Sequence, residues 1–300
     1  MLTNSGRMEI KMILYNPNIE TEPGAIRDPM ILPVGDKYYM VGTSPGFWEG
    51  YTPGVRLWSS RDLVHWTFET VAISSDDFSE DDWCKNRFWA PEIFCHKGRY
   101  YITVSCKNEK HNTPFGMFIA VADRVTGPYV MASREPFQTD GIDAHLFEDD
   151  DGTVRLFYGN YDIYMARFDM STLRPAEEPR VIVKRGEKGE WDSIGVEGPF
   201  CIKRGGIYYL WYSSWTRGYE MGWATTTDLS GTFTKWPDNP VITGDGSRLD
   251  CVGHNGAFTL MDGREAISFH GHMKQQTERL CIDFVRYPMP SRSPNIDIEL

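Results

Sequence analysis

The sequence predicts an all-β protein, a five-bladed β-propeller with about four antiparallel strands in each blade. Three observations indicate this fold class. A strand–turn–strand pattern recurs five times, further strand-like runs follow each copy, and no stretch keeps a sustained helical period. A repeat of roughly 40 to 50 residues with several strands in each unit is typical of propeller blades. Five repeats therefore predict five blades.

Residues 141–159 show the repeated unit most clearly. A short apolar run follows Asp143, the polar turn 149–152 comes next, and a second run of β-branched and aromatic residues spans 154–158. Two strands joined by an Asp-Gly turn form a β-hairpin. The three aspartates of the turn resemble a calcium loop, but the remaining ligands of an EF-hand are missing, which favours a hairpin turn.

A polar residue marks the start of each repeat. These residues are Asp28, Glu92, Asp143, Glu197 and His254, separated by 64, 51, 54 and 57 residues. Loop insertions at 46–54 and 76–82 account for most of the excess over the usual blade length. The first strand of each propeller blade lines the central channel, so we expect these side chains to face one shared pocket.

Composition and charge agree with a single closed domain. The chain has 300 residues, of which 41% are hydrophobic and 14% aromatic, ample for a core between stacked blades. We expect residues 14–300 to form this domain and residues 1–13 to be an N-terminal lead-in. The net charge of −11 argues against nucleic acid as a partner and is compatible with a neutral substrate such as a sugar.

The N-terminal residues 1–11 are polar, and no run of 18 apolar residues occurs in the sequence. The sequence therefore predicts a cytoplasmic protein without a membrane partner. The six cysteines show no CxxC spacing, which favours buried free thiols over disulfides. The sequence does not indicate an oligomeric state.

The motifs at the blade starts resemble those of a known enzyme family. In chain order, from about residue 14 to 290, they read Arg27-Asp28-Pro29, Trp89-Ala90-Pro91-Glu92, Ile142-Asp143, Glu197-Gly198-Pro199 and Gly253-His254-Asn255. This series is similar to glycoside hydrolase family 43. The resemblance implies a five-bladed propeller that hydrolyses glycosidic bonds with inversion, mostly in arabinofuranosides, xylosides and some galactosides.

The resemblance also implies three catalytic roles. Asp28 matches the general base that activates water, and Glu197 matches the general acid that protonates the leaving oxygen. Asp143 matches a third carboxylate that raises the pKa of the acid and orients it. An inverting hydrolase needs its two carboxyl groups about 6.5–9.5 Å apart, so that water fits between the base and the sugar. A neighbouring like charge keeps the acid protonated near neutral pH.

Further site residues follow from the same resemblance. His254 matches a histidine near a largely hydrated cation, often calcium, and its alternative role is that of a buried core histidine. One imidazole does not make a hard-cation site, so a structural calcium ion in the channel would take most ligands from water; no other cofactor is required. Arg279 resembles an arginine that contacts sugar hydroxyls. Trp89 resembles an aromatic residue of the family's pocket. Independently of the resemblance, Phe47, Trp48 and Trp215 lie in predicted loops or at strand ends; all four aromatics either stack on sugar faces or pack between blades.

The predicted function is release of a pentose or related sugar from short oligosaccharides, such as those derived from xylan or arabinan. One alternative is a phosphorylase of the family 130 type, which needs a basic cluster for phosphate where these blade starts are acidic. Another is a non-catalytic sugar-binding propeller, which would not require all three acids. His270 and His272 lie on one strand face like metal ligands, but no third ligand is evident.

Overall fold

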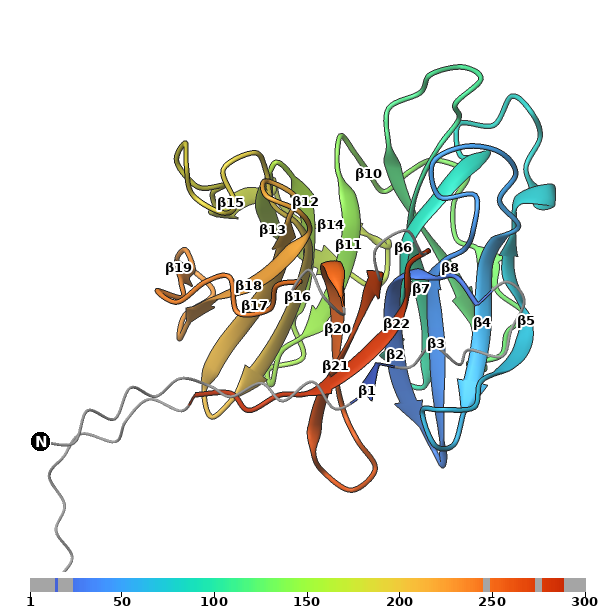
Figure 1. The fold of residues 1–300 in the computed structure, drawn as a ribbon. Coiled ribbons are helices and arrows are strands. Elements are labelled where there is room, and N and C mark those ends of the chain that lie inside the picture. The colour runs from blue at the N-terminus through green and yellow to red at the C-terminus, as the bar shows by residue number, and fades with distance from the viewer. Residues whose placement is uncertain (1–13, 16–23, 245–248, 273–276, 289–300) are drawn as a thin grey trace, which may run out of the picture.

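The computed structural model describes residues 14–15, 24–244, 249–272 and 277–288 and contains five antiparallel sheets, whose first strands contact one another in a closed circuit (Figure 1). The predicted all-β, five-bladed propeller is confirmed. In each sheet the strand that follows the blade motif is innermost, and the chain then runs outward through the next strands. The predicted lead-in, residues 1–13, lies outside the described residues.

The first two blades differ at their outer edge. Blade 1 contains β2 (Arg27–Val34), β3 (Lys37–Thr43), β4 (Gly54–Ser60) and β5 (Thr67–Ser74), followed by the short 3-10 helix η1 (Ser75–Asp77). Blade 2 contains β6 (Asn86–His96), β7 (Arg99–Lys107) and β8 (Gly116–Ala122). Two short strands, β9 (Val130–Met131) and β10 (Gln138–Thr139), both pair with β8. The outermost strand of blade 2 is thus divided in two.

The remaining blades keep the same inner plan. Blade 3 contains β11 (Ile142–Glu148), β12 (Val154–Asn160) and β13 (Asp162–Asp169), which pairs with both β14 (Arg174–Pro175) and β15 (Arg180–Val183). Blade 4 contains β16 (Glu197–Arg204), β17 (Ile207–Ser214), β18 (Glu220–Thr226) and β19 (Thr234–Lys235). Blade 5 contains β20 (Asp250–Thr259), β21 (Glu265–His272), β22 (Arg279–Phe284) and β1 (Leu14–Tyr15).

Blade 5 joins the two ends of the chain. The N-terminal strand β1 pairs with β22, the last strand. The neighbouring contact between blades 5 and 1 is also held by hydrogen bonds: the Ile26 backbone N donates to the Glu278 carbonyl oxygen at 3.0 Å, and Ser268 Oγ donates to the Pro29 carbonyl oxygen at 2.6 Å. The propeller is therefore closed by segments from opposite ends of the sequence.

Aromatic side chains fill the space between blades. In blade 4, Trp211 and Trp223 are completely buried, and their ring centroids lie 4.6 Å apart. Burial of each large apolar side chain stabilises the fold by roughly 1.5–3 kcal/mol. Between blades 3 and 4, the Phe147 ring packs edge-on against Tyr208 with centroids 6.0 Å apart, and buried side chains of both blades form one cluster, which confirms the predicted core between stacked blades.

The acidic turn 149–152 is a hairpin turn, as predicted. The Gly152 backbone N donates to the Asp149 carbonyl oxygen at 2.8 Å. The Asp149 carboxylate accepts hydrogen bonds from Lys203 Nζ at 2.9 Å and from the Tyr208 hydroxyl at 2.7 Å. Because both partners belong to blade 4, this turn ties blade 3 to blade 4.

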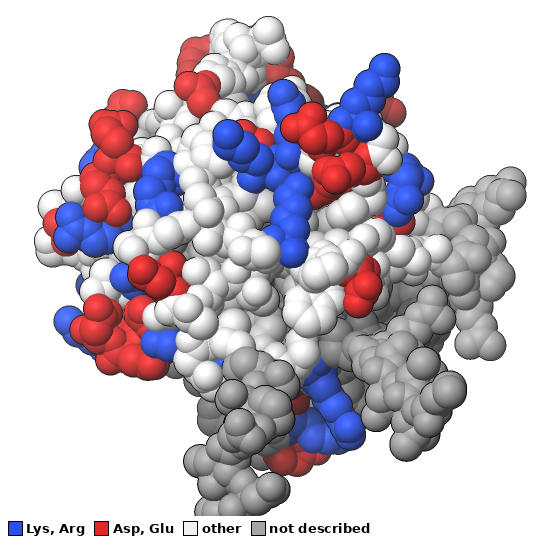
Figure 2. All heavy atoms as spheres, turned by 90° about the vertical axis from the view of Figure 1, so that its left-hand side faces the viewer, with Lys and Arg blue, Asp and Glu red and all other residues white. Residues whose placement is uncertain are grey.

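All six cysteines are free thiols, as the sequence predicted. Four are buried and Cys251 is half-buried, but Cys95 is exposed, which corrects the expectation of burial for that residue. Within the described ranges, no helix has the length and apolar character needed to cross a membrane. Figure 2 shows basic and acidic side chains interspersed over the side of the molecule that lies on the left in Figure 1.

Candidate active site

The innermost strand of every blade has a left-handed residue near its start, where the strand is kinked; β6 and β20 each have a second one three positions earlier, Arg87 (φ 56°) and Cys251 (φ 50°). The kinked residues are Asp28 (φ 52°), Ala90 (44°), Asp143 (65°), Gly198 (60°) and His254 (52°). The pairing register shifts beside each of them, as it does at a β-bulge. A bulge re-aims side chains, which explains how charged residues at strand starts come to face the channel.

The kinks correct the sequence alignment of two blades. In blade 4 the kinked residue is Gly198, and Glu197 directly precedes it. In blade 2 the kinked residue is Ala90, two positions before Glu92. Glu92 is buried, and its Oε2 lies 2.7 Å from Nδ1 of His145 on β11. Glu92 therefore pairs with a neighbouring blade and does not join the other acids.

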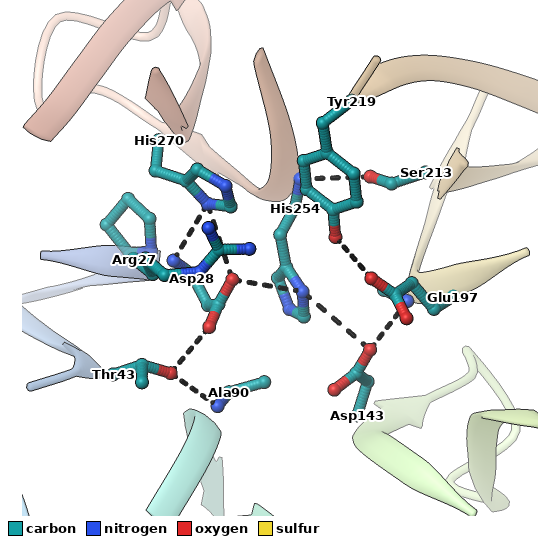
Figure 3. Close-up of polar contacts among 12 residues, drawn as sticks. Arg27, Asp28, Thr43, Ala90, Asp143, Glu197, Ser213, Tyr219, His254 and His270 are labelled. Atoms are coloured by element: carbon teal, nitrogen blue, oxygen red, sulfur yellow. Dashed lines mark hydrogen bonds and ion pairs between the residues drawn. The ribbon is translucent and has the colours of Figure 1, made fainter. Parts of the chain in front are cut away.

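Each kinked backbone N–H is bound by the preceding blade. Four acceptors occupy the same place in the second strand of their blades: Thr43 Oγ1 accepts from Ala90 N at 2.8 Å, Ser105 Oγ from Asp143 N at 2.8 Å, Ser213 Oγ from His254 N at 2.9 Å, and His270 Nδ1 from Asp28 N at 3.1 Å. Figure 3 shows three of these bonds around the site. They form a ring of hydrogen bonds that positions the functional side chains.

Blade 3 has glycine at the acceptor position, Gly159, which cannot supply a side-chain acceptor. Instead, the Gly198 backbone N donates to Asp143 Oδ2 at 2.9 Å. A Cβ atom at Gly159 would lie 2.9 Å from Cα of Glu197, too close for any side chain. The missing side chain thus lets Glu197 approach, and Asp143 takes over the role of acceptor.

A cavity of about 470 Å³ opens at these kinks. Asp28, Asp143 and Glu197 all line it, so the three predicted carboxylates meet in one place. Five of the six other predicted site residues also line it, namely Phe47, Trp48, Trp89, Trp215 and His254. A volume of this size is typical of sites that bind small molecules.

Asp28 is held as a carboxylate. Thr43 Oγ1 donates to its Oδ2 at 2.5 Å, and Nδ1 of His270 lies 3.3 Å from its Oδ1. Burial by itself would raise the pKa of Asp28, but the charges of His254 and Arg27 hold that pKa well below its usual value. An ionised carboxylate in a cavity can accept a proton.

Asp143 and Glu197 have the opposite tendency. Burial raises the pKa of Asp143 to about 8, with the charges of Glu197 and Asp28 adding to the effect and His254 opposing it. Burial also raises the pKa of Glu197, opposed by the Tyr219 hydroxyl, which donates to Glu197 Oε1 at 2.7 Å. Like charges this close do not ionise together easily, so the pair retains a proton near neutral pH.

His254 lies between the acids (Figure 3). Its Nδ1 is 3.5 Å from Asp28 Oδ1 and 3.8 Å from Asp143 Oδ2, so these two oxygens are at most 7.3 Å apart, the sum of both distances. Burial lowers the pKa of His254, but the surrounding carboxylates, Asp28 foremost, raise it more. Among the described residues no group of three or more His, Cys, Asp or Glu could hold a metal ion.

The guanidinium group in the cavity belongs to Arg27. It lies 4.9 Å from the ring centroid of Trp48 and 5.7 Å from that of Tyr219, and its NH1 donates to Glu278 Oε1 at 2.7 Å. The predicted Arg279 is on β22, paired with Gly271, and is not among the residues that line the cavity. The loose spacing of the last blade misled the sequence assignment, whereas Arg27 directly precedes Asp28.

The sequence motifs do not predict His270 and Tyr219, which also line the cavity. The sequence indicates His270 only as a candidate metal ligand, yet its ring stacks on Tyr219 with centroids 5.2 Å apart and its Nδ1 accepts the Asp28 N–H. Burial and the nearby Arg27 lower the pKa of His270 to about 4, which keeps it neutral and able to accept. His270 stands opposite the kinked Asp28 of the next blade. This position would indicate its role, but it can be recognised only once the pairing of the blades is known.

Known proteins are similar to this chain in sequence and architecture. The sequence profile described as Glycosyl hydrolases family 43 matches residues 19–288. The chain is 24% identical over 290 residues to the extracellular exo-alpha-(1->5)-L-arabinofuranosidase ArbA of Cellvibrio japonicus, covering 82% of this chain and 79% of that protein. It is 30% identical over 270 residues to xylosidase/arabinosidase 43B of Humicola insolens, covering 81% of this chain and 46% of that protein.

Solved structures agree. A thermostable family-43 glycoside hydrolase superimposes with a TM-score of 0.77 at 25% identity, covering 91% of this chain and 95% of that one. An endo-1,4-beta-xylanase from Bacteroides thetaiotaomicron gives a TM-score of 0.75 at 29% identity, covering 88% of this chain and 91% of that one. With its three carboxylates in one cavity, the chain belongs to glycosyl hydrolases family 43 and hydrolyses O-glycosyl bonds.

Proposed function

We propose that the protein is an inverting glycosidase that releases a pentose or related sugar from short oligosaccharides. The bond it hydrolyses is that of an arabinofuranoside, a xyloside or a galactoside. The observation that carries this proposal is the meeting of Asp28, Asp143 and Glu197 in one cavity. Nearby positive charges lower the pKa of Asp28, which suits a base, and burial raises the pKa of Asp143 and of Glu197, which suits an acid kept protonated by its neighbour. The names of the related arabinofuranosidase and xylosidase/arabinosidase support the choice of sugars.

In the proposed reaction, Asp28 removes a proton from a water molecule while the oxygen of that water attacks the anomeric carbon. Glu197 gives its proton to the glycosidic oxygen as the carbon–oxygen bond breaks. Asp143 keeps that proton on the acid before reaction and holds the Gly198 N–H beside it. One water is consumed, and the anomeric configuration inverts because water enters opposite the leaving group.

The aromatic wall is proposed to bind the sugar ring. The Trp89 indole N donates to the Phe47 carbonyl oxygen at 2.9 Å, and Trp48 packs edge-on against Trp89 with centroids 5.3 Å apart. These contacts fix ring faces along the cavity, where sugar C–H groups can pack. Arg27 supplies hydrogen-bond donors for hydroxyl groups.

No catalytic step is assigned to a metal ion. His254 would be one nitrogen ligand, and its Nδ1 already faces two carboxylates. Calcium prefers six to eight oxygen ligands, so the described residues do not form a calcium site on their own. The calcium ion suggested by resemblance stays a prediction.

Product analysis tests the proposed function. Incubation with a panel of 4-nitrophenyl arabinofuranoside, xyloside and galactofuranoside, followed by NMR during the first turnovers, should show a released sugar of inverted configuration. Phosphate should leave the rate unchanged, because Arg27, the guanidinium in the cavity, is already paired with Glu278. Retention of configuration, or phosphate-dependent release of a sugar phosphate, would contradict the proposal.

Gly159→Ser should reduce kcat by about 10-fold or more, although serine is the acceptor in two other blades. The new Cβ would press on Glu197 Cα, and overpacking of this kind costs about 1–3 kcal/mol. Steady-state kinetics and a melting curve separate loss of activity from loss of fold. The matched control is Gly231→Ala, where the nearest atom to the new Cβ is 3.7 Å away. Wild-type kcat for Gly159→Ser would disprove the role given to this glycine.

A further inference from the structure

A second hollow, of about 540 Å³, adjoins the catalytic cavity. The two share three lining residues, Ile142, Glu197 and Trp215. The rest of the second hollow comes from the loops and strand ends of blades 2 to 4, including Phe115, Asn160 and Tyr161. A third hollow, on the outer side of blades 2 and 3, shares no lining residue with either.

The catalytic carboxylates are distributed unequally between the two hollows. Asp28 and Asp143 line only the first cavity, whereas Glu197 lines both. A general acid must touch the oxygen that departs, and a general base must lie on the opposite face of the sugar. The bond to be cleaved therefore points from the first cavity toward the second hollow.

We propose that the second hollow binds the leaving-group sugar of an oligosaccharide, with Tyr161 as its stacking platform and specificity-determining residue. The inference rests on the proposed function and adds to it the direction in which the substrate lies. The sugar that is released by inversion occupies the first cavity. The remainder of the oligosaccharide passes Glu197 and Trp215 and lies over Tyr161.

The walls of the second hollow suit a sugar. Tyr161 is 58% exposed and Trp215 is 37% exposed, unusual for large aromatic side chains. Gly195 lies against both rings, since a Cβ there would be 2.8 Å from Trp215 and 3.2 Å from Tyr161. Asn160 and Asp140, which also line the hollow, are exposed and provide polar groups for hydroxyls.

Arg185 and Phe115 strengthen this surface. The Arg185 guanidinium lies 5.7 Å from the Tyr161 centroid, and the Val196 backbone N donates to the Tyr161 carbonyl oxygen at 3.0 Å. Phe115 packs against Trp89 with centroids 4.6 Å apart, so the aromatic walls of the two hollows are continuous. Tyr161 is therefore a braced platform next to the acid.

The test compares two substrates that carry the same sugar. One is an unlabelled oligosaccharide, and the other is the glycosyl fluoride, whose leaving group is a single atom. Tyr161→Ala should lower kcat/KM for the oligosaccharide about 10-fold, the effect of one stacking contact. Its kcat/KM for the fluoride should stay within about twofold of wild type, and Tyr161→Phe should behave like wild type on both.

Tyr51→Ala is the matched control, because Tyr51 is 67% exposed and lines neither hollow. It should leave both substrates unaffected. Equal losses on both substrates for Tyr161→Ala, or no loss on the oligosaccharide, would overturn the inference while leaving the proposed function in place. Wild-type enzyme that cleaves neither substrate would refute the proposed function itself.

Discussion

Glu197→Gln should lower kcat on natural oligosaccharides by about 10²- to 10⁴-fold, the usual contribution of a general acid. Glutamine keeps the shape of the side chain and an oxygen for the Tyr219 hydroxyl, which now donates to Glu197 Oε1 at 2.7 Å. Binding should therefore persist, and calorimetry with a non-hydrolysable analogue of the oligosaccharide should give the same Kd for the variant and the wild-type enzyme. Glu187→Gln, in an exposed loop before β16, is the matched control and should retain full activity.

The choice of leaving group makes this prediction specific to an acid. The leaving group of a 2,4-dinitrophenyl glycoside, dinitrophenolate, departs without protonation, so Glu197→Gln should lose far less kcat on this substrate than on an oligosaccharide. Equal losses on both substrates would show that Glu197 does not donate the proton.

The pH profile of the wild-type enzyme offers a second test of the acid. Activity needs the protonated acid, so the wild-type rate on oligosaccharides should fall as pH rises through the raised pKa values of Asp143, about 8, and Glu197.

Asp28→Asn should lower kcat by about 10²- to 10⁴-fold on every substrate, including the dinitrophenyl glycoside. The base acts on the attacking water and not on the leaving group, so a better leaving group does not rescue its loss. Asparagine can still accept the Thr43 hydrogen bond that Asp28 Oδ2 now accepts, which preserves the site. Asp36→Asn, in the exposed turn between β2 and β3, is the control and should be fully active.

The pH dependence of the base has the opposite sign to that of the acid. The pKa of Asp28 is lowered, so Asp28 stays ionised as pH falls through the usual range for aspartate. The wild-type kcat/KM should therefore hold its value on the acidic side until the pH is well below that range. An acidic limb near the ordinary pKa of aspartate, or substantial activity of Asp28→Asn on the dinitrophenyl substrate, would rule out Asp28 as the base.

Much of the fold was predictable because a propeller repeats its signals. The turn after Asp143 and the apolar runs beside it recur in each blade, and Asp28, Glu197 and His254 stand at recurring starts. Residues at the same position of successive repeats occupy equivalent places in successive blades. The five-bladed architecture and the meeting of the carboxylates both follow from it.

The unpredicted parts depend on backbone conformation and on contacts between blades. No sequence pattern shows that Ala90, two residues before Glu92, adopts the left-handed kink, whereas Gly198 beside Glu197 is the residue type that favours it. Glu92 consequently turns to His145, away from the cavity. A similar reason explains why Arg27, and not the predicted Arg279, lines the cavity. Arg27 is next to the kink at Asp28, and a kink changes the direction of neighbouring side chains.

The ring of hydrogen bonds that joins successive blades has a consequence for how the enzyme fails. Asp28 takes its backbone partner from His270 in blade 5, the blade completed by β1 from the other end of the chain. If the contact between blades 5 and 1 opens, Asp28, the proposed base, loses its hydrogen bond to His270, while every sheet keeps its own strand pairing. On heating, activity should then be lost at a lower temperature than secondary structure. The least stable contact between blades would determine how long the enzyme stays active.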